Sequence, residues 1–220
     1  MERIPEPELM DEPAQAAAYS GADFAAPHQL FADAVAARFD ELRAGTGTLL
    51  DVGCGPGDVT VRLARACPGW TIVGVDGAPE MLRLAHDRVA GAGLADRVQV
   101  EQAYLPAPGL LARRFDALTS NSLLHHLNDP DTLWQLARSL PAGAPVAVMD
   151  LRRPASPAAL DELVAELPAD TPAVLRDDFA YSLRAAYTPD EVRDQLAAAG
   201  LGHLAVEEPT DRHLLVSGRR

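Results

Sequence analysis

The chain has 220 residues, 48% of them hydrophobic and 23% charged, which suits one α/β domain with a sizeable buried core. Its formal net charge of −13 disfavours nucleic acid or an anionic membrane as a partner, because an acidic surface repels phosphate groups. No apolar run approaches the roughly 18 residues of a membrane span and no signal peptide is visible, so we expect a cytoplasmic protein.

The first part of the chain changes from an extended to a helical pattern. Residues 1–13 contain three prolines and are expected to form an extended arm. Residues 14–43 then have apolar positions at three- and four-residue spacing, which predicts a helix.

Short apolar runs alternate with helical patterns through the middle of the chain. The expected strands are 48–52, 70–75, 97–101, 117–120 and 145–150, and the expected helices are 59–67, 79–92 and 130–140. This alternation is typical of a parallel sheet that is covered by helices on both faces.

The last part of the chain departs from this alternation. Thr188 is a good helix N-cap, with Pro189 at the first helical position and Glu191 three residues after the cap. Two short strands, 203–208 and 213–217, follow and are expected to pair as an antiparallel hairpin. The sequence therefore predicts a seven-stranded, mostly parallel sheet with helices on both faces and a C-terminal antiparallel hairpin.

A glycine-rich turn follows the first expected strand, in the run LLDVGCGPGD at residues 49–58. Gly53, Gly55 and Gly57 allow positive φ and a close approach of backbone to a ligand. The run lacks the Gly-Lys-Ser/Thr of a P-loop, and Asp58 replaces the third glycine of a dinucleotide fingerprint, so a nicotinamide dehydrogenase is disfavoured. Asp51, two residues before the first glycine, suits a cationic ligand better than a phosphate.

This run resembles motif I of the class I S-adenosylmethionine-dependent methyltransferases. The run VGVDG at residues 73–77 resembles their second motif, and 115–127, with its Leu-His-His-Leu, resembles their fourth-strand motif. The C-terminal hairpin matches the end of their sheet, so the resemblance covers roughly residues 14–217. It implies that S-adenosylmethionine is the cofactor.

The resemblance also implies which residues bind this cofactor. Asp76 would hold both ribose hydroxyls, and Gln102-Ala103 stand where the family places an aspartate near the adenine; a glutamine carbonyl can still accept a hydrogen bond from the exocyclic amine. The full expected set is Tyr19, Asp51, Gly53, Gly55, Gly57, Asp76, Gly77, Met81, Gln102, Ala103 and Asn121.

The substrate end of the site is expected beyond the fourth strand. His125 or His126 could act as a general base; alternatively, one packs the loop and the other is solvated. The expected substrate contacts are Phe24, which precedes the first helix, and Arg152, Arg153, Tyr181, Arg184 and Tyr187 of the segment 152–187. We expect no metal ion.

The chain is thus expected to be one domain whose four parts are an N-terminal arm and lid helix (1–43), a cofactor-binding core (44–151), an insertion that acts as lid and substrate element (152–187), and a C-terminal helix and hairpin (188–220). The expected activity is methyl transfer by in-line displacement to a small molecule or a peptide. A non-methylating enzyme and a non-catalytic binding protein on the same fold are the alternatives. The acceptor and the oligomeric state are not indicated.

Overall fold

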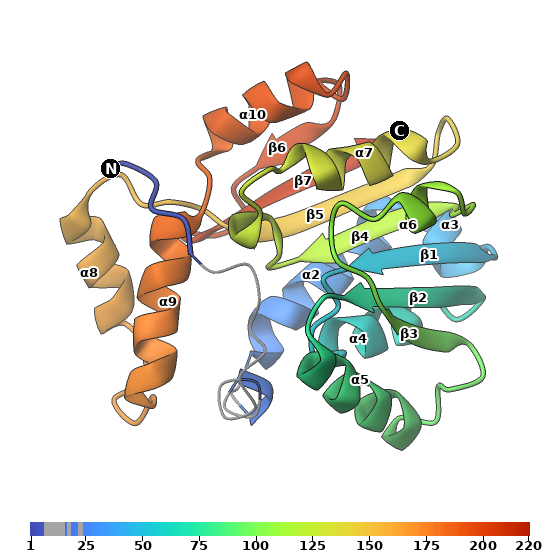
Figure 1. The fold of residues 1–220 in the computed structure, drawn as a ribbon, viewed down its shortest axis with the longest axis horizontal. Coiled ribbons are helices and arrows are strands. Elements are labelled where there is room, and N and C mark those ends of the chain that lie inside the picture. The colour runs from blue at the N-terminus through green and yellow to red at the C-terminus, as the bar shows by residue number, and fades with distance from the viewer. Residues whose placement is uncertain (7–15, 17–18, 22–23) are drawn as a thin grey trace.

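A computed structural model describes residues 1–6, 16, 19–21 and 24–220, and its centre is a twisted seven-stranded sheet (Figure 1). The strand order is β3-β2-β1-β4-β5-β7-β6. The strands are β1 Gly47–Val52, β2 Trp70–Asp76, β3 Val98–Gln102, β4 Ala117–Asn121, β5 Pro145–Leu151, β6 Ala205–Glu207 and β7 His213–Arg219. The first five strands are parallel, and β7 runs antiparallel to both of its neighbours, β5 and β6. The predicted sheet and its C-terminal hairpin are therefore confirmed.

Helices cover both faces of the sheet. They are α2 Ala25–Arg38, α3 Asp40–Ala44, α4 Asp58–Ala66, α5 Pro79–Gly91, α6 Pro108–Leu111, the 3-10 turn η1 Leu124–His126, α7 Asp131–Ser139, α8 Pro157–Ala165, α9 Ala173–Ala185 and α10 Pro189–Ala198. Helices α2 to α5 pack on one face, and α6, α7 and α10 pack on the other. Neighbouring residues of one strand, such as Leu49 and Leu50, enter opposite cores because side chains alternate along a strand.

The predicted N-terminal helix is interrupted. Within 14–43, residues 16 and 19–21 are helical and α2 spans Ala25–Arg38, while several residues before Ala25 lie outside the described part of the chain. Phe39 then adopts extended dihedrals (φ −132°, ψ 90°) before α3 begins. Its side chain is only 3% exposed, so the break in the helix places this ring in the core between α3 and the sheet.

The segment 152–187, whose structure the sequence did not define, contains α8 and α9. Figure 1 shows both helices beyond the carboxyl ends of the parallel strands, with the N-terminal residues beside α9. The backbone N–H of Ile4 donates to the carbonyl of Arg184 at 3.0 Å, and the terminal amine of Met1 donates to Ala155 at 2.9 Å. Residues 1–6 of the expected arm are neither helix nor strand, whereas 7–13 lie outside the described residues.

The start of α10 agrees with its sequence signal. The hydroxyl of Thr188 accepts a hydrogen bond from the backbone N–H of Glu191, and the Glu191 carboxylate accepts one from the Thr188 N–H. This capping box fixes the point at which the chain leaves the segment 152–187 and rejoins the core. Among the described residues, no helix combines the length and apolar character needed to cross a bilayer.

Candidate active site

A cavity of about 1000 Å³ lies at the carboxyl ends of β1, β2 and β4. Its lining comes from the glycine turn after β1, the end of β2, the loop that contains η1, one face of α9 and the turn before β7. Ligands of open α/β sheets bind at this edge, because the loops that follow parallel strands converge there. The sheet topology therefore brings the motifs found in the sequence to one place.

Glycine is favoured for a different structural reason at each of three positions in the turn after β1. All have positive φ: 72° at Gly53, 50° at Gly55 and 80° at Gly57. A Cβ on Gly53 would lie 2.8 Å from the Leu123 side chain, and one on Gly57 would lie 3.2 Å from Ala85. A Cβ on Gly55 would meet no atom of the described residues within 4 Å, although Gly55 lines the cavity. The bare backbone at Gly55 thus leaves room for a ligand.

Asp76, at the end of β2, braces this turn. One carboxylate oxygen accepts a hydrogen bond from the Gly55 N–H at 2.8 Å, and the other accepts one from the Ala78 N–H at 2.9 Å. Each carboxylate oxygen has a second lone pair, so the group can still accept hydrogen bonds from a ligand in the cavity. Asp76 therefore couples the shape of the turn to whatever binds beside it.

Asp51, in β1, is buried below the turn. Its carboxylate accepts hydrogen bonds from the hydroxyls of Thr60 (2.6 Å) and Thr119 (3.0 Å). Burial raises the pKa of Asp51 to about 6, and the two hydroxyls only partly oppose this shift. A positively charged ligand in the cavity would favour the ionised form of this carboxylate.

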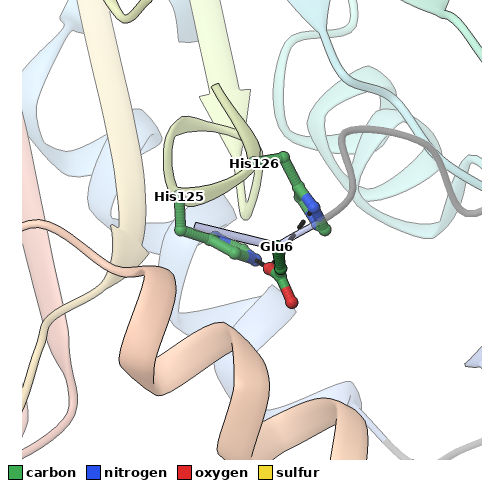
Figure 2. Close-up of side chains that lie close together, drawn as sticks. All are labelled: Glu6, His125 and His126. Carbon is green, nitrogen blue, oxygen red and sulfur yellow. Dashed lines mark ion pairs between the residues drawn. The ribbon is translucent and has the colours of Figure 1, made fainter. Parts of the chain in front are cut away.

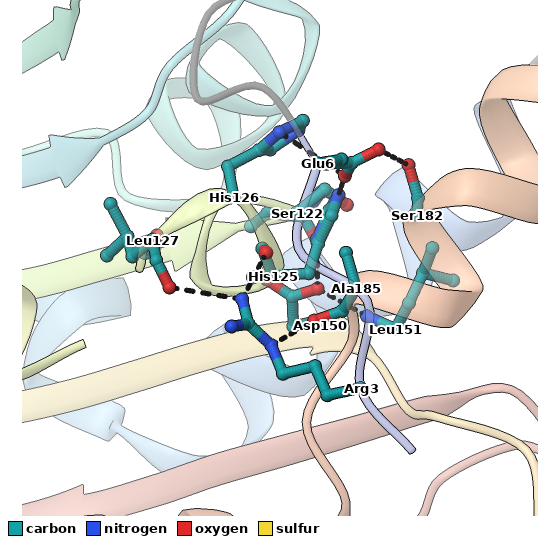
Figure 3. A network of polar contacts seen from close by, with 12 residues as sticks. Arg3, Glu6, Ser122, His125, His126, Leu127, Asp150, Leu151, Ser182 and Ala185 are labelled. Atoms are coloured by element: carbon teal, nitrogen blue, oxygen red, sulfur yellow. Dashed lines mark hydrogen bonds and ion pairs between the residues drawn. The ribbon is translucent and has the colours of Figure 1, made fainter. Parts of the chain in front are cut away.

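The histidine pair lies in η1, and both residues line the cavity. His125 is buried, and its Nδ1–H donates to Oδ1 of Asp150 at 2.5 Å, which leaves Nε2 directed away from Asp150 (Figure 3). Burial lowers the pKa of His125, but the carboxylates of Asp150 and Glu6 outweigh burial, so the net pKa is raised. His126 stacks beside it with ring centroids 4.2 Å apart.

The N-terminal segment brings a further carboxylate to these rings. Oε1 of Glu6 lies 3.3 Å from Nε2 of His125 and 3.3 Å from Nδ1 of His126 (Figure 2). Burial raises the pKa of Glu6. The Arg3 guanidinium holds the segment in place through backbone carbonyls of the η1 loop and α9, at 2.6 to 3.2 Å.

No sequence motif indicated Arg3, Glu6 or Asp150. Asp150 stands near the carboxyl end of β5, next to β4 in the sheet, and this position could have revealed it. Arg3 and Glu6 belong to the expected arm, and nothing in their spacing points to a site more than a hundred residues away.

Most of the expected cofactor residues line the cavity, but two do not. Those that do are Tyr19, Asp51, Gly53, Gly55, Asp76, Gly77, Met81, Ala103 and Asn121, and Phe24 also lines it. Gly57 packs against Ala85 of α5 instead, and Gln102 is exposed and donates a hydrogen bond to the Gly77 carbonyl at 3.0 Å. In this structure Gln102 braces the loop rather than facing the cavity.

The five expected substrate contacts of the segment 152–187 do not line the cavity. Arg152 pairs with Glu208 at 3.3 Å, and the buried Arg153 pairs with Glu191 at 2.5 Å. The Tyr187 hydroxyl donates to the backbone carbonyl just after η1 at 2.8 Å. These three side chains tie the segment to the core.

Helical geometry explains why the remaining two, Tyr181 and Arg184, do not line the cavity. The face of α9 that lines the cavity carries Leu175, Phe179 and Ser182, which recur at helical spacing. Tyr181 and Arg184 fall on other faces, and Tyr181 is 55% exposed. The insertion does line the site, but through different residues from those expected.

Comparison with known proteins gives the fold class and a match of one segment to a family model. The fold is that of class I S-adenosylmethionine-dependent methyltransferases: a putative S-adenosylmethionine-dependent methyltransferase from Methanococcus maripaludis superposes with a TM-score of 0.71 at 19% identity, covering 97% of this chain and 95% of that one. Residues 49–143 match the model of a methyltransferase domain family.

Curated relatives share this region. An uncharacterized methyltransferase of Mycobacterium bovis is 40% identical over 112 residues, which are 50% of this chain and 53% of that protein. The 27-O-demethylrifamycin SV methyltransferase of Amycolatopsis mediterranei is 34% identical over 162 residues, which are 70% of this chain and 58% of that protein. The chain thus spans only a little more than half the length of these relatives.

The first prediction compares two glycines with similar backbone strain. Gly55 and Gly93 both have positive φ, and a Cβ on either would meet no described atom within 4 Å, but only Gly55 lines the cavity. Gly55→Ala and Gly93→Ala should each cost about 1–2 kcal/mol of stability, because alanine is strained at this φ. Calorimetric titration with S-adenosylhomocysteine should show weakened binding only for Gly55→Ala. If both variants bind S-adenosylhomocysteine equally well, the ligand does not bind at this turn.

The second prediction concerns the pH dependence of stability. The pKa of Asp51 is about 6 in the folded chain, against about 3.9 for an unfolded aspartate, so the unfolded state loses this proton first as pH rises. The contribution of Asp51 is fully present below about pH 4 and is lost through pH 6, by up to about 3 kcal/mol. Urea unfolding at several pH values should show Asp51→Asn gaining stability relative to wild type over this range. A constant difference would contradict the assigned pKa.

Proposed function

We propose that this chain transfers the methyl group of S-adenosylmethionine to a small-molecule acceptor bound at the histidine end of the cavity. The observation that carries the proposal is that one cavity joins the open backbone at Gly55, beside Asp76, to His125 and His126. S-adenosylmethionine supplies a methyl group on a sulfonium, which a nucleophilic atom of the acceptor can displace in line. The chain supplies the binding, the alignment and the exclusion of water.

The cofactor half of the cavity fits this group. The space above Gly55 admits a ligand, and the Asp76 carboxylate is placed to accept hydrogen bonds from ribose hydroxyls. Tyr19 lines the same cavity and pairs with Phe24 at 4.9 Å between ring centroids, so an aromatic face is available to a cationic sulfonium.

The acceptor half has an apolar wall. Leu175 and Phe179 of α9 and Leu167 of the α8–α9 connection line it. Apolar lining with a few polar groups is typical of small-molecule sites. The relative from Amycolatopsis mediterranei, named for 27-O-demethylrifamycin SV, supports a small organic acceptor. The net charge of −13 argues against nucleic acid.

His125 is the best-placed residue of the chain to handle the acceptor proton. Its Nδ1–H is held by Asp150, so its Nε2 has the lone pair that can accept a proton at the cavity wall. The Asp150 carboxylate would stabilise the resulting imidazolium, as the raised pKa of His125 indicates.

The proposal is tested by binding and by product mass. Purified protein should bind S-adenosylhomocysteine in a calorimetric titration, and incubation with S-adenosylmethionine and a panel of apolar hydroxylated or amino compounds should add one methyl mass to a panel member. Binding without any methylated product, across small molecules and peptides, would favour the non-methylating alternatives. Absence of binding would refute the cofactor assignment.

The third prediction isolates the role of Asp76 toward the ribose. Asp76→Ala should weaken S-adenosylhomocysteine binding by roughly 30- to 150-fold, because a charge-assisted pair of hydrogen bonds is lost. Since Asp76 also braces Gly55, a ligand comparison is needed as control. Wild type should bind 5′-methylthioadenosine more tightly than its 2′-deoxy analogue, and the variant should bind both alike. If Asp76→Ala still binds 5′-methylthioadenosine more tightly than the 2′-deoxy analogue, Asp76 does not contact the ribose 2′-hydroxyl.

The fourth prediction concerns the histidines. His125→Ala should lower kcat by roughly 100-fold while leaving S-adenosylhomocysteine affinity unchanged, because the ring acts at the acceptor end. His86→Ala is the matched control, since His86 is exposed on α5 and does not line the cavity. Unchanged kcat in both His125→Ala and His126→Ala would mean that the acceptor needs no group from this pair.

A further inference from the structure

We propose that Glu6, His125 and His126 bind one divalent transition-metal ion at the acceptor end of the cavity. The three side chains come from the N-terminal segment and from η1, and one potential ligand atom from each lies within 4.8 Å of the other two (Figure 2). Two imidazole nitrogens and one carboxylate oxygen form a ligand set that zinc and related metals prefer. A bound ion would occupy the lone pair on Nε2 of His125, so in the metal-bound chain His125 would be a ligand and would not accept the acceptor proton. The metal proposal does not require that the methyl-transfer proposal be correct.

The distances among the three side chains are compatible with a shared metal ion. Oε1 of Glu6 is buried and makes no hydrogen bond with the described residues, although it lies 3.3 Å from a nitrogen of each histidine. A tetrahedral ion with bonds of about 2.1 Å separates its ligand atoms by about 3.4 Å. The distances from Oε1 of Glu6 to the two histidine nitrogens therefore already match the separation between ligand atoms that a shared ion requires. A buried oxygen without a hydrogen bond is costly, and a cation would remove that cost.

The surrounding groups orient two of the three ligands. Asp150 accepts the Nδ1–H of His125, which fixes the tautomer whose Nε2 is available to a metal. The Ser182 hydroxyl donates to Oε2 of Glu6 at 3.3 Å, on the oxygen that does not face the rings (Figure 3). A carboxylate behind a ligating histidine is the usual arrangement of protein metal sites.

The charges near the cluster favour a cation. The carboxylates of Asp150 and Asp178 both interact electrostatically with Glu6, so three carboxylates lie near the cluster. Arg3 opposes this charge, but its guanidinium is directed to backbone carbonyls of the η1 loop and α9. A bound metal ion would lower the repulsion among the three carboxylates.

The position of the cluster gives the ion access to a second molecule. His125 and His126 both line the cavity, so coordination positions not taken by the three side chains face the acceptor half. Such a position suits an oxygen of the acceptor, which would select hydroxylated or carbonyl compounds over purely apolar ones.

The test is a direct metal titration of the full chain after chelator treatment and dialysis. Co²⁺ should bind with a stoichiometry of one and give visible d–d absorption, and Zn²⁺ should displace it. Mg²⁺ at millimolar concentration should not compete, because imidazole ligands disfavour it. Glu6→Ala and His126→Ala should each weaken Co²⁺ binding by 100-fold or more. His86→Ala and His203→Ala, whose rings are exposed, should bind as wild type.

Each outcome decides the proposal. Absence of stoichiometric Co²⁺ binding by folded wild type overturns it, and so does binding that survives both Glu6→Ala and His126→Ala. Thermal unfolding without metal checks that each variant is folded. S-adenosylhomocysteine titration of the same samples reports on the cofactor half separately: intact cofactor binding without metal binding rejects the metal site only, whereas the reverse result rejects the cofactor assignment only.

Discussion

The turn between β1 and α4 has to cross the carboxyl end of β2 while keeping its own backbone paired. The N–H groups of Gly53 and Cys54 both donate to the Val75 carbonyl, at 2.8 and 3.0 Å, and Asp76 accepts the N–H of Gly55. These bonds bend the chain into a conformation with three positive φ values, which side chains would oppose. Because the turn is held from β2, its remaining surface at Gly55 is free to face a ligand.

The position of this turn determines much of the rest of the site. Beneath it, Asp51 links β1 to α4 through Thr60 and to β4 through Thr119, so one buried carboxylate joins three elements that converge on the cavity. Burial of that carboxylate is unfavourable for its charge, and a cationic ligand nearby would offset part of the cost. The Asp51 carboxylate therefore both links β1, α4 and β4 through hydrogen bonds and favours binding of a cationic ligand.

The acceptor end depends on contacts between distant parts of the chain. Glu6 reaches rings in η1, and Ser182 of α9 donates to Glu6, so the N-terminal segment lies between the core and the segment 152–187. Arg3 also stacks over the Tyr187 ring at 4.1 Å. Residues 1–6 thus pack against the η1 loop and α9, and the Glu6 side chain contacts both histidines directly.

Local pattern in the sequence predicted the strands, the hairpin and the glycine turn, and the resemblance to class I methyltransferases pointed to Asp76 and the histidine pair. Each depends on residues close in the chain: alternation in strands, the capping box at Thr188, and turn chemistry at residues 53–57. Local pattern could not predict the break at Phe39, because burial of that ring depends on packing against the sheet.

Only the tertiary structure determined which residues come together around the histidine pair. The face of α9 that lines it is set by how the whole helix docks, so Phe179 enters and Tyr181 does not. Glu6, Asp150 and the histidines meet through contacts between segments separated by 25 to more than 100 residues, and no spacing in the sequence encodes such a meeting. Their charges affect one another only once burial has removed water from between them.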